Sequence, residues 1–143
     1  MTQQANPNYG ALITRFSLGG ILLSHGLLKV IVFTIPGTVG YFADLGLPAI
    51  AAYLTIFAEI VGGTAILLGV YTRLASLLSI PLLLGALWAH AGNGWVFSSE
   101  GGGWEFPLLL VVLAAAVALQ GNGRFALRKL PLIDEFIPRS LRA

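Results

Sequence analysis

The chain has 143 residues, of which 57% are hydrophobic and only 10% are charged, and its formal net charge is +2. A soluble domain of this size exposes too much surface to be covered by so few charged side chains, so the composition excludes an ordinary water-soluble protein. The absence of cysteine excludes disulfides, cysteine-ligated zinc and iron–sulfur clusters within the chain. These features predict an integral membrane protein whose outer surface contacts lipid.

Four apolar segments follow one another along the chain, each close to the roughly 20 residues with which a helix crosses a bilayer. They cover residues 10–33, 48–69, 74–91 and 105–120. Residues 34–47, between the first two segments, are rich in proline and glycine and are typical of turns. The sequence therefore predicts an all-α fold with a single domain, residues 1–143. We expect a four-transmembrane-helix bundle followed by a tail, residues 121–143, at the cytoplasmic membrane interface.

The distribution of basic residues predicts the orientation of the chain. The second connection contains Arg73, and the fourth segment is followed by Arg124, Arg128, Lys129, Arg139 and Arg142, whereas the first and third connections contain neither lysine nor arginine. By the positive-inside rule, both termini are cytoplasmic.

Five ionisable residues are expected to gather in the outer half of the bundle. At 1.5 Å per helical residue, Lys29 lies about 6 Å, His25 about 12 Å and Glu59 about 16 Å from the outer ends of their helices. His90 and Glu105 lie close to the outer rim. Matching these depths pairs Glu59 with His25, and Glu105 with Lys29 or His90.

Two interpretations of this cluster are open. A polar network can simply fix the packing of membrane helices. Ionisable groups within membrane helices also commonly mark a binding site. Because five such groups exceed what packing requires, we expect a ligand pocket formed by His25, Lys29, Glu59, His90 and Glu105.

Two other residues in the apolar segments have more than one interpretation. Arg15 lies near the cytoplasmic boundary, where its long side chain is expected to extend to the headgroups, although it also has the length to reach inward toward Glu59. Pro81 lies inside the third segment and should kink that helix. The kink either only affects packing or opens space for a ligand.

Haem and metal binding are not expected. His25 and His90 are the two histidines of the chain, and their estimated depths differ by about 10 Å, too much for both to ligate one haem iron. A metal held by His25, Glu59 and His90 has no motif spacing to support it.

Short motifs occur in order along almost the whole chain. They are Arg15, Leu18, Gly19, His25, Gly26 and Lys29; Phe42, Gly46, Leu47 and Pro48; Glu59, Gly62 and Gly63; Gly69, Thr72 and Arg73; His90; Gly103, Glu105 and Pro107; and Gly121 and Gly123. In this order and spacing, the chain resembles the DoxX family of membrane proteins. The likeness weakens after Gly123, because the Ser-Leu-Asp element common in the family is absent here.

The resemblance implies a small subunit of a quinone-linked redox system in a bacterial-type inner (plasma) membrane. Related proteins are often labelled oxidoreductases, so the chain is a possible subunit of a quinone-linked enzyme. We expect it to bind a quinone-like or other amphipathic molecule, with Glu59 and His25 as a proton relay. The alternative is a non-enzymatic scaffold or assembly factor that holds a partner subunit. Transport of a small solute ranks last, because the polar residues lie mainly in one half. We expect contacts with membrane lipid, a protein partner or a second copy of the chain, and none with nucleic acid.

Overall fold

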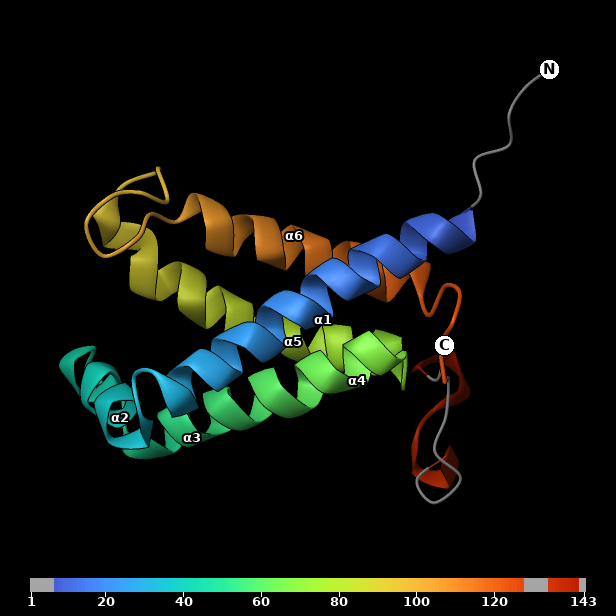
Figure 1. The fold of residues 1–143 in the computed structure, drawn as a ribbon, viewed down its shortest axis with the longest axis horizontal. Helices are drawn as coiled ribbons and strands as arrows, with labels where there is room; N and C mark the ends of the chain where they lie inside the picture. The colour runs from blue at the N-terminus through green and yellow to red at the C-terminus, as the bar shows by residue number, and fades with distance from the viewer. Residues whose placement is uncertain (1–6, 128–133, 142–143) are drawn as a thin grey trace.

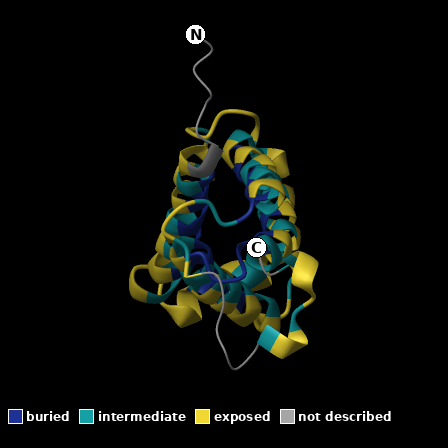
Figure 2. Cartoon of the chain, turned by 90° about the vertical axis from the view of Figure 1, so that its right-hand side faces the viewer, coloured by how far each residue is buried: buried dark blue, intermediate teal, exposed yellow. Residues whose placement is uncertain are grey.

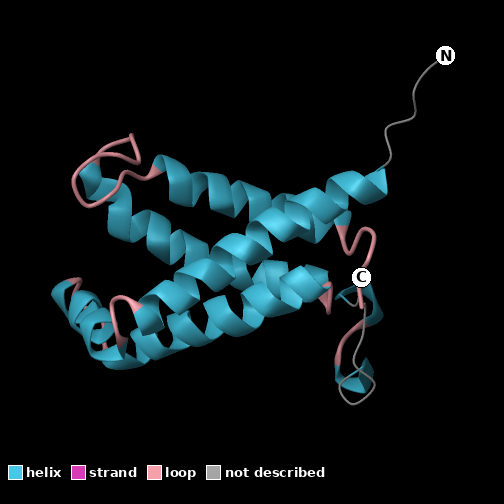
Figure 3. Ribbon diagram, in the orientation of Figure 1, coloured by secondary structure: helices cyan, strands magenta, loops and turns pink. Residues whose placement is uncertain are grey.

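The computed structural model describes residues 7–127 and 134–141, and the elements in these residues are helical (Figure 3). The principal helices are α1 (Pro7–Ile31), α2 (Ile35–Asp44), α3 (Ala49–Phe57), α4 (Gly63–Leu68), α5 (Thr72–His90) and α6 (Glu105–Gln120). A π-helical turn, Ala58–Gly62, joins α3 to α4, so that these elements form one continuous rod. The predicted all-α fold is confirmed.

Three helical rods are long and apolar enough to cross a membrane, counting the described residues. They are Tyr9–Ile31, Ala49–Leu68 and Thr72–Asn93, the last extended by a 3₁₀ turn, Ala91–Asn93. These rods agree with the first three predicted spans to within a few residues. The fourth predicted span coincides with α6, which is apolar but only 16 residues long.

The helices pack around a small apolar core. In Figure 1, α5 and α6 run beside each other, and α1 crosses between this pair and the rod formed by α3 and α4. The core includes Leu18, Leu22, Ile66, Leu110 and Val117, all nearly or fully buried. Figure 2 shows the buried residues on the inner faces of the helices and the exposed residues outside. Many of the exposed residues are large and apolar, as a lipid-facing surface requires.

Glycines bring α1 and α4 into backbone contact. A Cβ atom added to Gly63 would lie 2.6 Å from the backbone nitrogen of Leu23 and 3.0 Å from the carbonyl oxygen of Gly19. A Cβ atom added to Gly19 would lie 2.8 Å from the backbone nitrogen of Leu67. Small residues of this kind allow membrane helices to approach closely.

The segment predicted to consist of turns contains α2, so that prediction is wrong. The hydroxyl of Thr34 accepts a hydrogen bond from the backbone nitrogen of Gly37 at 3.3 Å. Pro36 lies in the first turn of α2, where the N–H that a proline lacks would have no partner within the helix. Beyond the end of α2, Gly46 has a φ of +76°. The proline and glycine residues that suggested turns therefore begin and end a short helix.

The described part of the tail packs against the helix ends. The backbone nitrogen of Leu127 donates to the carbonyl of Leu68 at 3.0 Å, and the guanidinium of Arg124 donates to the hydroxyl of Tyr9 at 3.1 Å. Further along, the hydroxyl of Tyr71 donates to the carboxylate of Asp134 at 2.9 Å. The tail was expected to lie along the membrane interface, and residues 128–133 and 142–143 of that prediction lie outside the described residues.

Candidate functional site

A cavity of about 650 Å³ lies between α1, α2, α3, α5 and α6. Its wall is mostly apolar and aromatic, and Pro81 of α5 is part of it. The polar residues in the wall are His25, Lys29, Tyr41, Thr55, Glu59 and His90. The structure thus brings four of the five predicted site residues to one cavity, whereas Glu105 does not line it.

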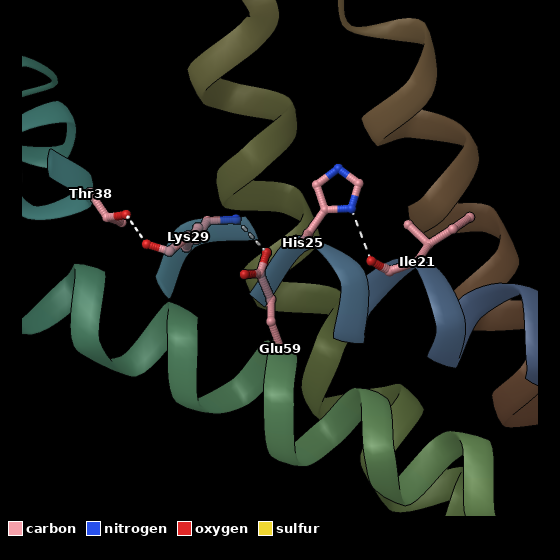
Figure 4. Close-up of polar contacts among 5 residues, drawn as sticks. All are labelled: Ile21, His25, Lys29, Thr38 and Glu59. Atoms are coloured by element: carbon pink, nitrogen blue, oxygen red, sulfur yellow. Dashed lines mark hydrogen bonds and ion pairs between the residues drawn. The ribbon is translucent and has the colours of Figure 1, made fainter. Parts of the chain in front are cut away.

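An ion pair joins α1 to the π-helical turn at the cavity wall. The ammonium of Lys29 donates to Oε1 of Glu59 at 2.8 Å, and the two side chains are 18% and 8% exposed (Figure 4). Taking both charges out of water is costly, so each of them needs the other. The hydrogen-bond partner of Glu59 is thus Lys29 and not the expected His25. The proton relay through Glu59 and His25 stays a prediction.

The π-helical turn sets the direction of Glu59. Such a turn inserts an extra residue into a helix and rotates the residues that follow it, and π-turns are frequent at functional sites. Glu59 is the second residue of the turn, and its other oxygen, Oε2, is buried without a hydrogen-bond partner among the described residues. The sequence of Ala58–Gly62 carries no signal that predicts the turn.

A hydrogen bond from α2 holds the C-terminal end of α1. The hydroxyl of Thr38 donates to the backbone carbonyl of Lys29 at 3.0 Å (Figure 4). Thr38 is 3% exposed, and Tyr41 of the same helix lines the cavity. The short helix that the sequence analysis missed therefore forms part of the cavity wall and supports the residue that carries the ammonium group.

The imidazole of His25 stands in the cavity wall between α1 and α6. Its Nδ1 lies 2.9 Å from the backbone carbonyl oxygen of Ile21, one helical turn earlier. The ring stacks on Phe106, with the two ring centroids 6.2 Å apart and the planes at 29°. These two contacts fix the orientation of the ring, so that its other nitrogen, Nε2, points away from Ile21 (Figure 4).

His90 holds the loop between α5 and α6. Its Nδ1 lies 2.9 Å from the carbonyl oxygen of Gly101 and 3.0 Å from that of Gly102. The side-chain amide of Asn93 donates to the same two carbonyls, each at 3.0 Å. His90 does not pair with Glu105, contrary to the sequence-based prediction.

Glu105 closes the same loop from the other side. Its Oε1 accepts a hydrogen bond from the backbone nitrogen of Phe97 at 2.7 Å. The predicted partners of Glu105 were Lys29 and His90, and both pairings are wrong. The structure places this carboxylate at the start of α6, where it also interacts favourably with the positive end of the helix dipole.

The substitution Glu105→Gln tests whether this carboxylate serves the loop alone. We expect the free energy of unfolding to fall by about 1 kcal/mol, because a hydrogen bond to a charged acceptor becomes a weaker neutral one. Unfolding in detergent, followed by tryptophan fluorescence, measures the change. Glu100→Gln is the matched control, since Glu100 is exposed on the same loop. An equal effect of both substitutions would contradict the assignment.

Arg15 lies outside the cavity, buried at the opposite end of the bundle. Its side chain is fully buried, so it does not extend to the headgroups, and it does not reach Glu59. Nη1 donates to the carbonyls of Ile66 at 3.2 Å and Leu67 at 2.6 Å. Nη2 donates to the carbonyl of Arg124 at 2.8 Å. It also lies 3.4 Å from the carbonyl oxygen of Phe125. Arg15 therefore joins α1, the end of α4 and the tail.

Among the described residues, no three histidine, aspartate or glutamate side chains lie close enough together to hold a metal ion. The chemistry that the site offers is thus a set of hydrogen-bonding groups and one ion pair in an apolar cavity. Such an arrangement suits a molecule that is mainly apolar with a few polar atoms.

Comparisons with known proteins agree with the resemblance seen in the sequence. The model of the DoxX family matches residues 10–92. The chain is also 31% identical over 118 residues to a protein of Bacillus subtilis (strain 168) named "Putative oxidoreductase CatD", which covers 82% of this chain and 84% of the relative. No solved structure matches the chain.

Proposed function

Because the chain belongs to the DoxX family and is an integral membrane protein, we propose that it binds a quinone-like, amphipathic ring molecule in the cavity between its helices. One observation carries the proposal: the Lys29–Glu59 ion pair lies in the wall of an otherwise mainly apolar cavity. An ion pair that only joined two helices would not need a cavity beside it. A ligand with an apolar body and polar ring substituents matches both parts of the wall.

The size and lining of the cavity support a ring-shaped ligand. Small-molecule sites commonly have volumes of about 300–1,000 Å³ and place a few polar groups among apolar and aromatic side chains. The cavity has about 650 Å³, and Phe106 and Trp88 contribute aromatic surface. Lipid-soluble quinones have this combination of an apolar ring and two polar atoms.

A redox role is proposed for the ligand rather than for the protein chain. The relative's name contains the word oxidoreductase, and the sequence of this chain has no cysteine to hold an iron–sulfur cluster. Electrons would therefore pass through the bound molecule or a partner subunit. The proposed function is that of a membrane subunit in a quinone-linked system, with Lys29, Glu59, His25 and His90 as the binding residues.

We further propose that α6 is a fourth span and that both termini lie in the cytoplasm of a bacterial-type cell. At 1.5 Å per residue, α6 is about 24 Å long, short of the roughly 30 Å hydrocarbon core but sufficient if the bilayer thins locally. The basic residue Arg73 lies in the first turn of α5, and Arg124 and Arg139 lie in the tail. With these residues on the cytoplasmic side, the cavity lies in the outer half of the membrane.

The substitution Gly85→Leu tests the cavity as the binding site. Gly85 lines the cavity, and a Cβ atom added there would meet no atom within 4 Å, so a leucine fits without disturbing the helix and occupies ligand space. We expect decylubiquinone to bind the wild-type protein in lipid nanodiscs and to bind the variant at least tenfold more weakly. Isothermal titration calorimetry measures both dissociation constants.

The matched control is Gly20→Leu, because Gly20 also has open space around its Cβ position but does not line the cavity. This control should bind decylubiquinone like the wild-type protein. If Gly85→Leu and Gly20→Leu have the same affinity, the ligand binds elsewhere. If the wild-type protein binds no quinone but copurifies with a partner subunit, the scaffold function replaces this proposal.

A further inference from the structure

The proton of the His25 ring is fixed by a backbone carbonyl. The carbonyl oxygen of Ile21 can only accept a hydrogen bond, so the Nδ1 that lies 2.9 Å from it must donate. A neutral imidazole carries one N–H, and Nε2 is then an acceptor. His25 lines the cavity, and its Nε2 points away from Ile21 and is left as an acceptor for a ligand (Figure 4).

A separate contact fixes the proton of the His90 ring on Nδ1 as well. Its Nδ1 faces the carbonyl oxygens of Gly101 and Gly102, neither of which can donate. The neutral ring therefore keeps its proton on Nδ1, and its Nε2 is an acceptor as well. The two histidines of the cavity wall thus cannot donate a hydrogen bond to a ligand unless they gain a second proton.

The ion pair adds Glu59 as a third acceptor and Lys29 as a charged donor. The carboxylate of Glu59 is an acceptor, and its Oε2 has no donor among the described residues. Lys29 has three N–H groups, of which one is directed to Oε1 of Glu59. The hydroxyls of Tyr41 and Thr55 donate and accept equally well, so they do not distinguish one ligand from another. Trp88 in the wall carries an uncharged indole N–H, which is a donor only.

From this inventory we propose that the cavity prefers the reduced form of the ring molecule, a quinol, over the oxidised quinone. The two oxygens of a quinone only accept, so Lys29 is the one charged donor that it meets in the wall. The two hydroxyl groups of a quinol can donate to two of the three acceptors on His25, His90 and Glu59, and a quinol oxygen can still accept from Lys29. The inference rests on the proposed function, because it names the chemical form that the same cavity selects.

The preference has a measurable redox consequence. A quinone takes up two electrons and two protons to become a quinol, so a protein that binds the quinol more tightly stabilises the reduced side of that couple. For a two-electron couple, each tenfold difference between the two dissociation constants raises the midpoint potential of the bound couple by about 30 mV. We expect at least a tenfold preference, because Oε2 of Glu59, which is buried, is left without a donor when the quinone is bound.

The test compares three probes on the whole protein in lipid nanodiscs under anaerobic conditions. They are decylubiquinol, decylubiquinone and the dimethyl ether of decylubiquinol, which keeps the ring and the alkyl chain but has no hydroxyl proton. We expect the quinol to bind at least tenfold more tightly than either of the others. Equal binding of quinol and quinone, or tighter binding of the quinone, would overturn the inference while leaving the proposed function in place. Failure of all three probes to bind would overturn both.

The substitution His25→Phe checks the origin of the preference. Phenylalanine keeps a ring that can stack on Phe106 but has no nitrogen to accept a hydrogen bond. We expect the affinity for decylubiquinol to fall about tenfold and that for decylubiquinone to change less than twofold. A parallel loss for both probes would show that His25 acts only through packing and would contradict the hydrogen-bond assignment.

Discussion

Replacing Arg15 with methionine is expected to lower the free energy of unfolding by about 2–6 kcal/mol, because two main-chain carbonyls lose their hydrogen-bond donor. The methionine fills much of the same space but provides no donor. The carbonyls of Leu67 and Arg124, which Arg15 now contacts at 2.6 and 2.8 Å, would lose the donors that they have in this buried place. Each unsatisfied buried carbonyl costs about 1–3 kcal/mol. Unfolding by dodecyl sulfate in mixed micelles, followed by tryptophan fluorescence, measures the loss.

Two further variants make the test of Arg15 specific. Arg15→Lys keeps the charge but cannot direct two nitrogens to two sets of carbonyls, so it should recover only part of the loss. Arg139→Met is the control, because Arg139 is exposed and its replacement should change the free energy of unfolding by less than about 0.5 kcal/mol. A small effect of Arg15→Met, similar to that of the control, would mean that the guanidinium lies in the headgroups instead.

Gly63→Val is expected to be the second most damaging substitution, with a loss of about 3 kcal/mol in the free energy of unfolding. The first carbon of the new side chain would lie 2.6 Å from the backbone nitrogen of Leu23 and 3.0 Å from the carbonyl oxygen of Gly19. Both obstacles are backbone atoms, so α1 and α4 would have to move apart. The same unfolding experiment measures the effect.

The neighbouring Gly62 provides the matched control for Gly63. A Cβ atom added to Gly62 would meet no atom within 4 Å, so Gly62→Val changes helix propensity to a similar extent without forcing the helices apart. We expect Gly62→Val to change the free energy of unfolding by less than about 1 kcal/mol. Equal losses for the two variants would indicate that α1 and α4 are not in backbone contact at Gly63.

The helices could be predicted because a single long apolar segment crosses a membrane as an α-helix. Without water, every backbone group within the bilayer must bond inside its own segment, and a helix achieves this. The boundaries of α6 were predicted to the residue, and those of α1 differ by two or three residues. The helix α2 was missed because Pro36 and Gly46 lie at or beyond its ends, where such residues favour a helix boundary rather than prevent a helix.

The residues that line the cavity were predicted better than the hydrogen bonds and ion pairs that they form. Depth along a helix placed His25, Lys29, Glu59 and His90 in one region, and these four residues do line one cavity. Depth alone says nothing of the rotation of a helix about its axis or of the angle at which two helices cross. The π-helical turn at Glu59 changes that rotation and has no sequence signal, so the partner of Glu59 could not be foreseen.

The other pairings were predicted wrongly because the actual hydrogen-bond partners are main-chain groups. His25, His90 and Glu105 each bond to a main-chain group, whereas matching of charges considers only side chains. The same reason applies to Arg15, whose contacts are with carbonyl oxygens. In a chain with so few charged side chains, the backbone supplies most of the available partners.

The contacts of Arg15 also set an order for biosynthesis. Arg15 and the carbonyl of Arg124 are 109 residues apart in the chain. At a synthesis rate of about 5–20 residues per second, the ribosome needs roughly 5–20 s to make the second partner after the first. The carbonyls of Ile66 and Leu67 are made about halfway through that interval, but Nη2 of Arg15 lacks its final acceptor until the interval ends. The hydrogen bonding of Arg15 is therefore completed only when the segment after the last helix emerges, and a chain truncated before Arg124 would leave Nη2 without this acceptor.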